Sequence, residues 1–247
     1  MTRHEPAPKA TARAPVPRAA RGRGIPPVPA WKRAMDVTLA LGVGVVVLPV
    51  ALVIALVILL RDGRPVLYRA ERMAAPGVPF MLCKFRTMRP AAADRGVTGP
   101  EKAARVTPTG RVLRRCRLDE IPQLLNVLAG EMSFVGPRPP LREYVERFPD
   151  LYARVLACRP GITGLATLVY HRHEERLLSR ARSAAETDRI YARACVPRKA
   201  RLDLLYRRHR SPGLDLWIMW RTFLAVLPGN RGRPGRRRWR RRGGRGR

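Results

Sequence analysis

Two adjacent carboxylates, Asp119 and Glu120, are the side chains of this sequence best suited to chemistry on a phosphate. Pro122 fits the first turn of a helix, and apolar residues follow at the spacing of one helical face, so we expect a helix to begin at the pair. These apolar residues are Ile121, Leu124, Leu125 and Leu128, and the pair is preceded by Arg111, Arg114, Arg115 and Arg117. A helix N-terminus and nearby arginines keep a carboxylate ionised, which suits attack on phosphorus or binding of a metal ion. The alternative is a structural role, in which the acids cap the helix and offset its dipole.

The two carboxylates should have separate roles. Side chains of neighbouring helical residues point about 100° apart, so Asp119 and Glu120 should not both address the same atom. Each also opposes the ionisation of the other unless a cation lies nearby. Mg²⁺ would supply that cation, so we expect Mg²⁺ as the cofactor, with Asp119 as a ligand.

Basic side chains that could hold phosphate oxygens lie on both sides of the pair. Lys84 and Arg86 occupy alternate positions of one stretch, which places them on the same face if that stretch is a strand. An exposed strand face without a ligand is an equally good interpretation. Arg138 stands between Pro137 and Pro139, which fix the backbone, so its planar guanidinium could grip a phosphate bidentately at little ordering cost.

The elements before the acid pair should position these cations. Short apolar stretches at 65–68 and 80–85 are separated by the turn signal Pro76-Gly77, which predicts a β-hairpin. An uncharged stretch of 24 residues, Val37–Leu60, precedes this hairpin. As a straight helix it would be about 36 Å long, enough to cross a hydrocarbon core of about 30 Å.

Pro49 divides this uncharged stretch into two arms, each about half a bilayer long. A proline favours a bend because it lacks a backbone donor and clashes with the preceding turn. Basic residues flank both ends, so the positive-inside rule places both ends on the cytoplasmic side. A helix that enters one leaflet and returns fits these features, and a simple span is the alternative that the residues leave open.

Positive charge is concentrated at the two ends of the chain. Residues 1–33 and 231–247 together supply 17 of the 32 net positive charges, and both ends are rich in Pro, Gly and Arg. Such segments bury too little apolar surface to offset chain entropy, so we expect them to be disordered. We favour an anionic membrane surface as their partner, because basic segments beside a membrane anchor gain about 1 kcal/mol per charge. A solvated tail and nucleic acid are the alternatives.

The cysteines and histidines form no strong metal-binding pattern. The cysteines, at positions 83, 116, 158 and 195, lie more than thirty residues apart without a CxxC pair, which favours a reducing cytoplasm. His171 and His173, followed by Glu174 and Glu175, have no further ligands at suitable spacing. We interpret this stretch as a solvated helix or loop.

Taken together, the motifs resemble those of the monotopic phosphoglycosyl transferases, the bacterial sugar transferase family of undecaprenyl-phosphate enzymes. The resemblance covers about residues 31–228. Its motifs are Lys32-Arg33-x-x-Asp36, Lys84–Met88, Leu118–Gln123, Asn126–Pro139, Arg159–Leu165, and Pro197-x-Lys199-x-x-x-Asp203-x-x-Tyr206 followed by Leu214-Asp215-x-Trp217.

The resemblance implies that the protein transfers a sugar 1-phosphate from a UDP-sugar to polyprenyl (undecaprenyl) phosphate and releases UMP. This step would initiate glycan or exopolysaccharide assembly. Asp119 would attack the β-phosphorus and hold the phosphosugar covalently, while Glu120 would activate the lipid phosphate or assist the metal. The candidates for phosphate binding are then Lys84, Arg86, Arg114, Arg138 and Arg159, with Asp203 and Tyr206 as further polar candidates.

The implied fold is a mixed, helix-rich α/β domain with a short hairpin and surface helices, anchored by an N-terminal re-entrant membrane helix. We expect a disordered basic segment at 1–30, the re-entrant helix at 31–61 with its bend at Pro49, the catalytic domain at 62–229, and a disordered Arg-rich tail at 230–247. Such a protein would be monotopic on the inner (cytoplasmic) membrane of a bacterial cell, with its catalytic domain in the cytoplasm. The alternative function is that of a membrane-tethered nucleic-acid-binding or scaffold protein, although we do not expect nucleic acid as the partner.

Three departures from the family pattern concern residues near the motifs. Ala70 and Thr167 stand where the family usually has glutamine, and the usual glycine after Glu71-Arg72 is shifted among Met73-Ala74-Ala75. In addition, Cys116 stands where the family commonly has serine or threonine, and Arg117 where it often has serine. Because none of them belongs to the acid pair, they bear on the choice of sugar more than on activity. The sequence leaves open which sugar and glycan pathway are involved, the role of the tails, and the oligomeric state, a homodimer included.

Overall fold

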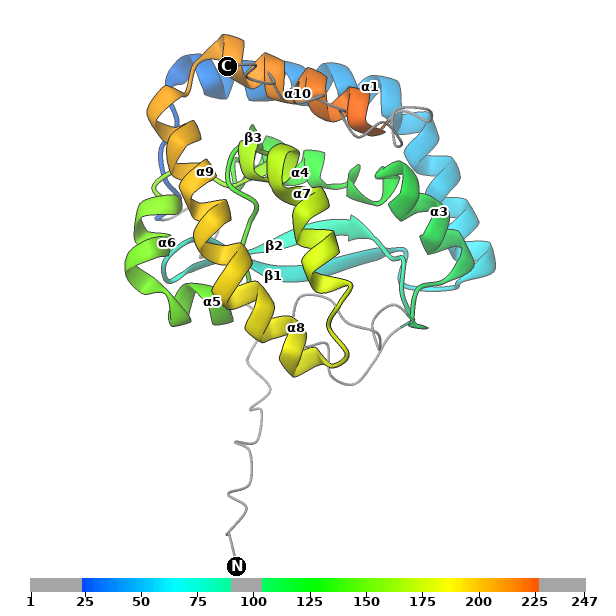
Figure 1. Ribbon diagram of the computed structural model, residues 1–247. Helices are drawn as coiled ribbons and strands as arrows, with labels where there is room; N and C mark the ends of the chain where they lie inside the picture. Colours follow the sequence, from blue (N-terminus) through cyan, green and yellow to red (C-terminus); the bar gives the residue numbers. More distant parts are fainter. Residues whose placement is uncertain (1–23, 90–103, 227–247) are drawn as a thin grey trace, which may run out of the picture.

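The computed structural model describes residues 24–89 and 104–226, so most of the two basic terminal segments lies outside the described residues. The elements, in chain order, are α1 (Ala30–Arg61), β1 (Leu67–Ala75), β2 (Val78–Phe85), α3 (Pro108–Cys116), the 3₁₀ turn η2 (Leu118–Glu120), α4 (Gln123–Leu128), β3 (Ser133–Val135), α5 (Arg142–Arg147), α6 (Pro149–Val155), β4 (Gly161–Thr163), α7 (Leu165–Leu178), α8 (Ala184–Ile190), the π-helical turn η3 (Tyr191–Cys195), α9 (Val196–His209) and α10 (Pro212–Val226). The prediction of a mixed, helix-rich α/β domain is confirmed (Figure 1).

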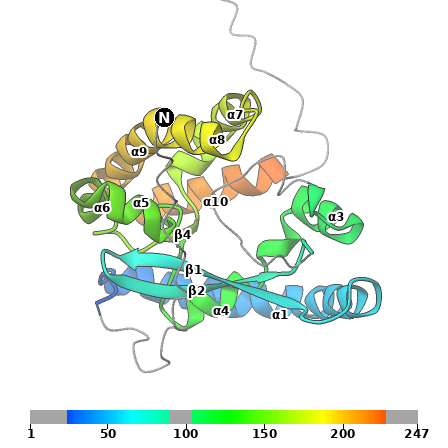
Figure 2. The same cartoon turned by 90° about the horizontal axis from the view of Figure 1, so that it is seen from below.

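The predicted hairpin is present and forms the larger of the sheets. β1 and β2 pair antiparallel, with Leu67 opposite Phe85 and a register irregularity between Met73 and Ala75. One face of the hairpin packs with α1 and α4 around Phe80, Leu82 and Val127, while α5 lies against β1. Seen from below, the hairpin separates α1 and α4 from the group formed by α5, α6, α8 and α9 (Figure 2). The hairpin therefore connects the N-terminal helix to the rest of the domain.

The long apolar helix α1 is bent. It contains Pro49, and its two halves run in different directions (Figure 1). The predicted bend is thus confirmed, and the missing donor and ring clash of a proline explain it. The helix is long and apolar enough to cross a membrane. Its middle is exposed, with Val45 and Val46 each 75% accessible, whereas residues near both ends are buried.

The N-terminal turns of α1 are fixed to the domain through buried charges. The Lys32 ammonium donates to the Asp215 carboxylate of α10 at 2.5 Å, and both side chains are almost fully buried. The Asp36 carboxylate accepts hydrogen bonds from the Ser133 hydroxyl and from the Phe134 amide. Arg33 donates to the last carbonyl groups of α4. The first two of these contacts tie α1 to the C-terminal helix and to β3.

The C-terminal end of α1 is held by Arg86, directly after β2. Its guanidinium donates to the carbonyl groups of Asp62, Gly63 and Arg64. These groups are the C-cap carbonyl of α1 and two carbonyls in the loop after it. Ile54 and Ile58 pack on Phe85 and Leu113 just before this point. Both ends of α1 therefore contact the same domain.

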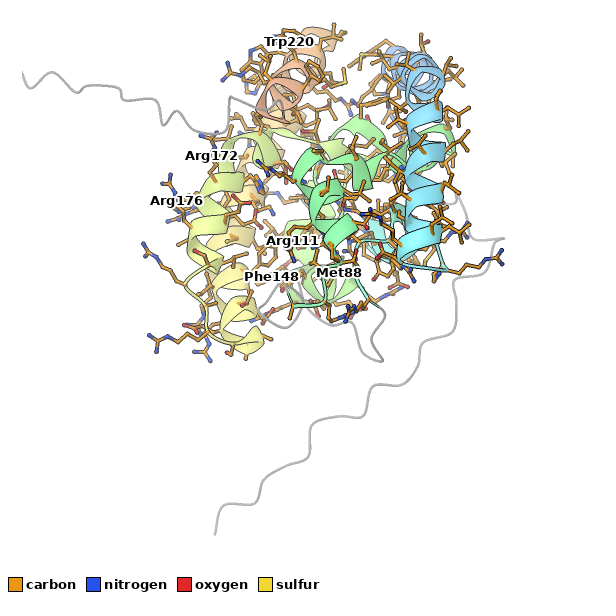
Figure 3. The ribbon with its side chains drawn as sticks, turned by 90° about the vertical axis from the view of Figure 1, so that its right-hand side faces the viewer. Met88, Arg111, Phe148, Arg172, Arg176 and Trp220 are labelled. Atoms are coloured by element: carbon orange, nitrogen blue, oxygen red, sulfur yellow. The ribbon has the colours of Figure 1, made fainter. Side chains whose placement is uncertain are left out.

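Helix α10 carries a second set of exposed apolar side chains. Leu216, Trp217, Trp220 and Phe223 are each between 48% and 58% accessible. Figure 1 shows α10 running beside the first half of α1 along one edge of the molecule, and Figure 3 shows Trp220 projecting outward from that edge. The exposed apolar surface is thus concentrated on these two helices.

The buried Lys32–Asp215 pair predicts a large stability difference between variants. Lys32→Met leaves Asp215 charged and unpaired inside the protein, so the free energy of unfolding should fall by about 3–5 kcal/mol. Arg147→Met removes an exposed pair with Asp188 and should cost less than about 1 kcal/mol. Denaturant unfolding in detergent measures both. Equal losses in the two variants would contradict a stabilising role for the buried pair, and Lys32→Met with Asp215→Asn should recover part of the loss.

Candidate active site

The acid pair lies in a 3₁₀ turn and not at the start of an α-helix. Arg117 adopts the left-handed conformation and ends α3, and the turn Leu118–Glu120 follows before α4 begins at Gln123. The predicted helix therefore starts later than expected, because the chain reverses at Arg117 first. The predicted apolar face is also incomplete, since Leu125 is 57% exposed while Leu124 and Leu128 pack with buried Val127.

The Glu120 carboxylate is surrounded by cations. One oxygen lies 2.9 Å from the Lys84 ammonium, 3.4 Å from the Arg138 guanidinium and 3.6 Å from that of Arg117. Burial alone would raise the pKa of Glu120, but the positive charges of Arg138, Lys84 and Arg117 outweigh it and lower the pKa to about 2. Glu120 is therefore ionised at neutral pH, and the three cations are arranged around it.

Asp119 has a different environment although it is the adjacent residue. Its side chain is buried, and the Oδ1 atom has no hydrogen-bond partner among the described residues. Burial raises the pKa of Asp119, and the charge of Glu120 adds to this, while Lys84 acts in the opposite direction. A carboxylate with an unpaired buried oxygen is available to a ligand, a metal ion or an electrophile. The two adjacent acids therefore have different surroundings.

The loop that carries Arg138 is fixed by its backbone. β3 and β4 pair parallel, and the chains cross so closely at Gly136 and Gly161 that a Cβ atom on either would lie 2.3 Å or less from a backbone atom. The Gly161 amide also donates to the Pro137 carbonyl at 2.9 Å. Arg138 is thus presented to Glu120 from a rigid loop, as the flanking prolines predicted, and its side chain remains 40% exposed.

The other predicted phosphate-binding residues have different surroundings. Arg114 donates to the Thr87 hydroxyl and contributes a positive charge near Asp119. Arg86 binds the carbonyl groups after α1, Arg159 binds the Pro26 carbonyl, and Tyr206 donates to Asp215 and to the Val135 carbonyl. In the structure Lys84, Arg114 and Arg138 surround the acid pair, whereas Arg86, Arg159 and Tyr206 support the framework.

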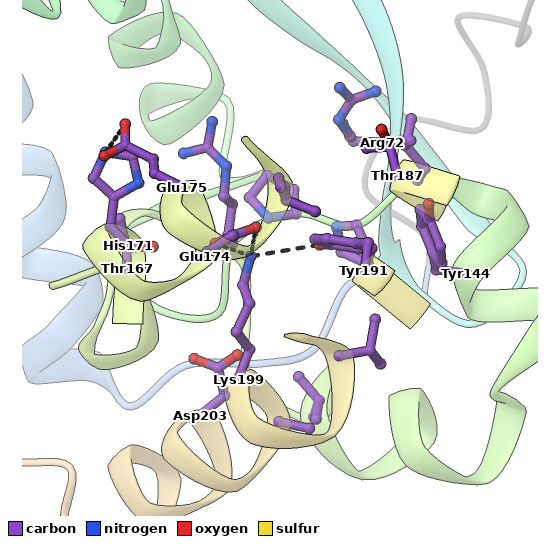
Figure 4. A pocket seen from close by; sticks show the side chains of 18 of the residues that line it. Arg72, Tyr144, Thr167, His171, Glu174, Glu175, Thr187, Tyr191, Lys199 and Asp203 are labelled. Atoms are coloured by element: carbon purple, nitrogen blue, oxygen red, sulfur yellow. Dashed lines mark hydrogen bonds and ion pairs between the residues drawn. The ribbon is translucent and has the colours of Figure 1, made fainter. Parts of the chain in front are cut away.

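A cavity of about 670 Å³ opens beside Arg117 and Arg138. Its walls come from the loop after Arg138 and from α7, η3 and α9, and they include Thr167, His171, Glu174, Glu175, Tyr191, Lys199 and Asp203 (Figure 4). Of these residues, the sequence proposed only Asp203 for the site. A signal was available for the α7 residues, because positions 167, 171, 174 and 178 recur at the spacing of one helical face.

Comparison with known proteins identifies the family. The family model described as bacterial sugar transferase matches residues 28–229. The chain belongs to the bacterial sugar transferase family. It is therefore an enzyme of the sugar-phosphate transferase type, as the motifs indicated.

Three relatives illustrate the range of this family. The chain is 40% identical to the uncharacterized sugar transferase EpsL of Bacillus subtilis over 79% of this chain and 87% of that protein. It is 37% identical to the UDP-glucose:undecaprenyl-phosphate glucose-1-phosphate transferase of Escherichia coli over 69% of this chain and 40% of that protein. It is 32% identical to the UDP-N-acetylgalactosamine-undecaprenyl-phosphate N-acetylgalactosaminephosphotransferase of Aeromonas hydrophila over 80% of this chain and 44% of that protein. The chain thus spans less than half the length of the last two relatives.

The acid pair fits the expected Mg²⁺ in one respect. Among the described residues, no three His, Cys, Asp or Glu side chains are grouped to hold a metal ion. Mg²⁺ commonly takes one or two carboxylates and completes its shell with water and substrate phosphates. The unpaired Oδ1 atom of Asp119 could provide one such ligand, whereas Glu120 is already paired with cations. Asp119 is therefore the better candidate ligand.

The charges around Glu120 predict a pH-dependent contribution to stability. Because the folded pKa of about 2 lies below the usual 4.5, the contribution is complete above pH 4.5 and is lost as the pH falls toward 2. The difference in unfolding free energy between the native protein and Glu120→Gln should be on the order of 3 kcal/mol at pH 6 and should shrink below pH 4.5. Unfolding curves across this range measure it. Glu146→Gln, at an exposed acid, is the control, and a constant Glu120 difference would contradict the prediction.

Proposed function

We propose that this enzyme transfers a sugar 1-phosphate from a UDP-sugar to undecaprenyl phosphate, releasing UMP, and so initiates glycan or exopolysaccharide assembly. The observation that carries the proposal is the buried Asp119 carboxylate with an unpaired oxygen, set beside three cations in a member of the sugar transferase family. Relatives named as UDP-glucose and UDP-N-acetylgalactosamine phosphotransferases act with undecaprenyl phosphate, which supports the donor and acceptor classes.

In the first step, an oxygen of Asp119 attacks the β-phosphorus of the UDP-sugar. A bond forms between this oxygen and phosphorus, and the bond from phosphorus to the bridging oxygen breaks. The electron pair leaves on UMP, and the phosphosugar remains on Asp119 as an acyl phosphate. Lys84, Arg114 and Arg138 are close enough to the pair to offset the charge that develops on the phosphoryl oxygens.

In the second step, an oxygen of undecaprenyl phosphate attacks the same phosphorus. The bond to Asp119 breaks, the carboxylate is restored, and the product is the lipid diphosphate that carries the sugar. Mg²⁺, when bound at Asp119, would offset negative charge on the donor diphosphate.

Glu120 is better suited to positioning than to proton transfer. A carboxylate with a pKa of about 2 is a weak base at neutral pH, and its oxygen is occupied by Lys84 and Arg138. We therefore propose that Glu120 holds these two cations where the phosphates bind. The alternative roles expected from the sequence, activation of the lipid phosphate or assistance to the metal, would require Glu120 to exchange these partners.

We also propose that α1 enters one leaflet of the bacterial inner membrane and returns, with the catalytic domain in the cytoplasm. Lys32 and Arg86 hold opposite ends of α1 on the same domain, which is difficult to reconcile with ends on opposite sides of a bilayer. The exposed apolar side chains of α1 and α10 would face the lipid. The alternative of a nucleic-acid-binding function rests on the basic tails, which lie outside the described residues.

Asp119→Asn tests the covalent step. The amide keeps the shape of the side chain but cannot attack phosphorus, so UMP release should fall by at least about 10³-fold and no phosphosugar adduct should form. Intact-mass measurement after incubation with UDP-glucose or UDP-N-acetylgalactosamine detects the adduct on the native protein. Glu120→Gln is the matched control, since it should retain some adduct if Glu120 only positions cations. A normal adduct on Asp119→Asn would remove Asp119 as the nucleophile.

The topology of α1 can be tested with tags at residues 1 and 247. If the helix re-enters, protease added to inside-out vesicles should remove both tags, and protease added to spheroplasts should remove neither. Pro49→Leu restores a backbone donor and removes the ring clash, so it should favour a straight helix and shift some molecules toward a span. Tags of the native protein on opposite sides would mean that α1 spans the membrane.

A further inference from the structure

The cavity beside the acid pair has two chemically different regions. Arg117 and Arg138 lie on the side that faces Glu120, and they supply positive charge. The carboxylates of Glu174, Glu175 and Asp203 lie on the walls formed by α7 and α9. A ligand that fills the cavity would therefore meet cations at one end and carboxylates farther in.

Asp203 is the most unusual group in this cavity. It is only 6% exposed, it lines the cavity, and no hydrogen bond or ion pair joins it to another residue of the described ranges. Burial raises the pKa of Asp203 to about 7, although the nearby Lys199 charge lowers it. Figure 4 shows Asp203 beside the Lys199 side chain, whose ammonium instead contacts Glu174 and the Tyr191 hydroxyl. Because Asp203 lines the cavity and has no partner among the described residues, its carboxyl group is available there to a ligand or water.

We propose that this cavity holds the sugar ring of the donor, and that Asp203 accepts a hydrogen bond from one of the ring hydroxyls. The inference rests on the proposed transfer from a UDP-sugar. The diphosphate would lie against Arg117 and Arg138, which contact Glu120 of the acid pair, and the sugar would extend toward α7 and α9. Thr167, one of the positions that depart from the family pattern, also lines the cavity and would contact the same ring.

The hydrogen-bonding groups of the cavity favour a sugar over the uracil base. A carboxylate only accepts hydrogen bonds once it is ionised, so a ligand that binds Asp203 in that state must bring a donor. A sugar ring offers a hydroxyl at most of its carbons. Uracil offers one N–H between two carbonyl oxygens, so an ionised Asp203 would repel those oxygens. On the same side, the Lys199 ammonium can donate hydrogen bonds, and the Tyr191 hydroxyl can both donate and accept them.

Calorimetric binding of UDP and of UDP-sugars tests this assignment. All variants carry Asp119→Asn, so that the donor is not consumed, and the probes are UDP, UDP-glucose and UDP-N-acetylgalactosamine. Asp203→Asn should weaken binding of the preferred UDP-sugar by about tenfold, since a hydrogen bond to a charged acceptor is lost. Its affinity for UDP, which lacks the sugar, should be unchanged. Asp150→Asn, at an exposed acid of α6, is the control and should change neither.

Other outcomes overturn the inference. Equal weakening of UDP and UDP-sugar binding by Asp203→Asn would place the nucleoside in the cavity, and no change in either would remove the donor from it. Should Asp203→Asn lack a cooperative unfolding transition, Thr167→Val replaces it, with the same selective loss of UDP-sugar affinity expected. UMP release by the chain with native Asp119 tests the proposed function separately. No UMP from a broad panel of UDP-sugars would reject both, whereas UMP release without selective loss would reject only the sugar site.

Discussion

The buried ion pair between Lys32 and Asp215 is the interaction on which the arrangement of this protein depends. A buried ammonium must be paired, and its partner here lies on α10, at the other end of the described chain. Asp215 also accepts a hydrogen bond from Tyr206 of α9, so three helices meet at one carboxylate. One turn later, Asp36 binds the first residues of β3. Helix α1 and the strand that leads to the Arg138 loop are therefore positioned by the same few charges.

The acid pair shows how one turn of chain can give neighbouring carboxylates opposite properties. Glu120 faces cations and has a low pKa, whereas burial and the charge of Glu120 raise the pKa of Asp119. A more basic carboxylate is generally a better nucleophile, and a paired one is a better positioning group. The 3₁₀ geometry matters because it turns the two side chains toward different surroundings. The opposite pKa shifts thus arise from position and not from residue type.

Local patterns in the sequence predicted the local elements. The Pro76-Gly77 turn indicated the hairpin, and Pro49 indicated the bend in α1. The acid pair was recognised, but its 3₁₀ turn was not, because the left-handed residue Arg117 gives no composition signal. Arg86 was a candidate for phosphate binding and Tyr206 a further polar candidate, whereas in the structure they contact main-chain groups after α1 and in β3, and Asp215. Such partners are distant in sequence, and only the tertiary fold brings them together.

The close approach of backbone at Gly136 and Gly161 has a consequence for how this family can vary. No side chain fits at either glycine, so the path of the loop is set without any contribution from the residue it displays. A substitution at position 138 would therefore change the side chain offered to the ligand and leave the path of the loop unchanged. The scaffold and the ligand contacts can then diverge independently. Substitutions of the residues that line the cavity could change the preferred donor while both glycines are kept.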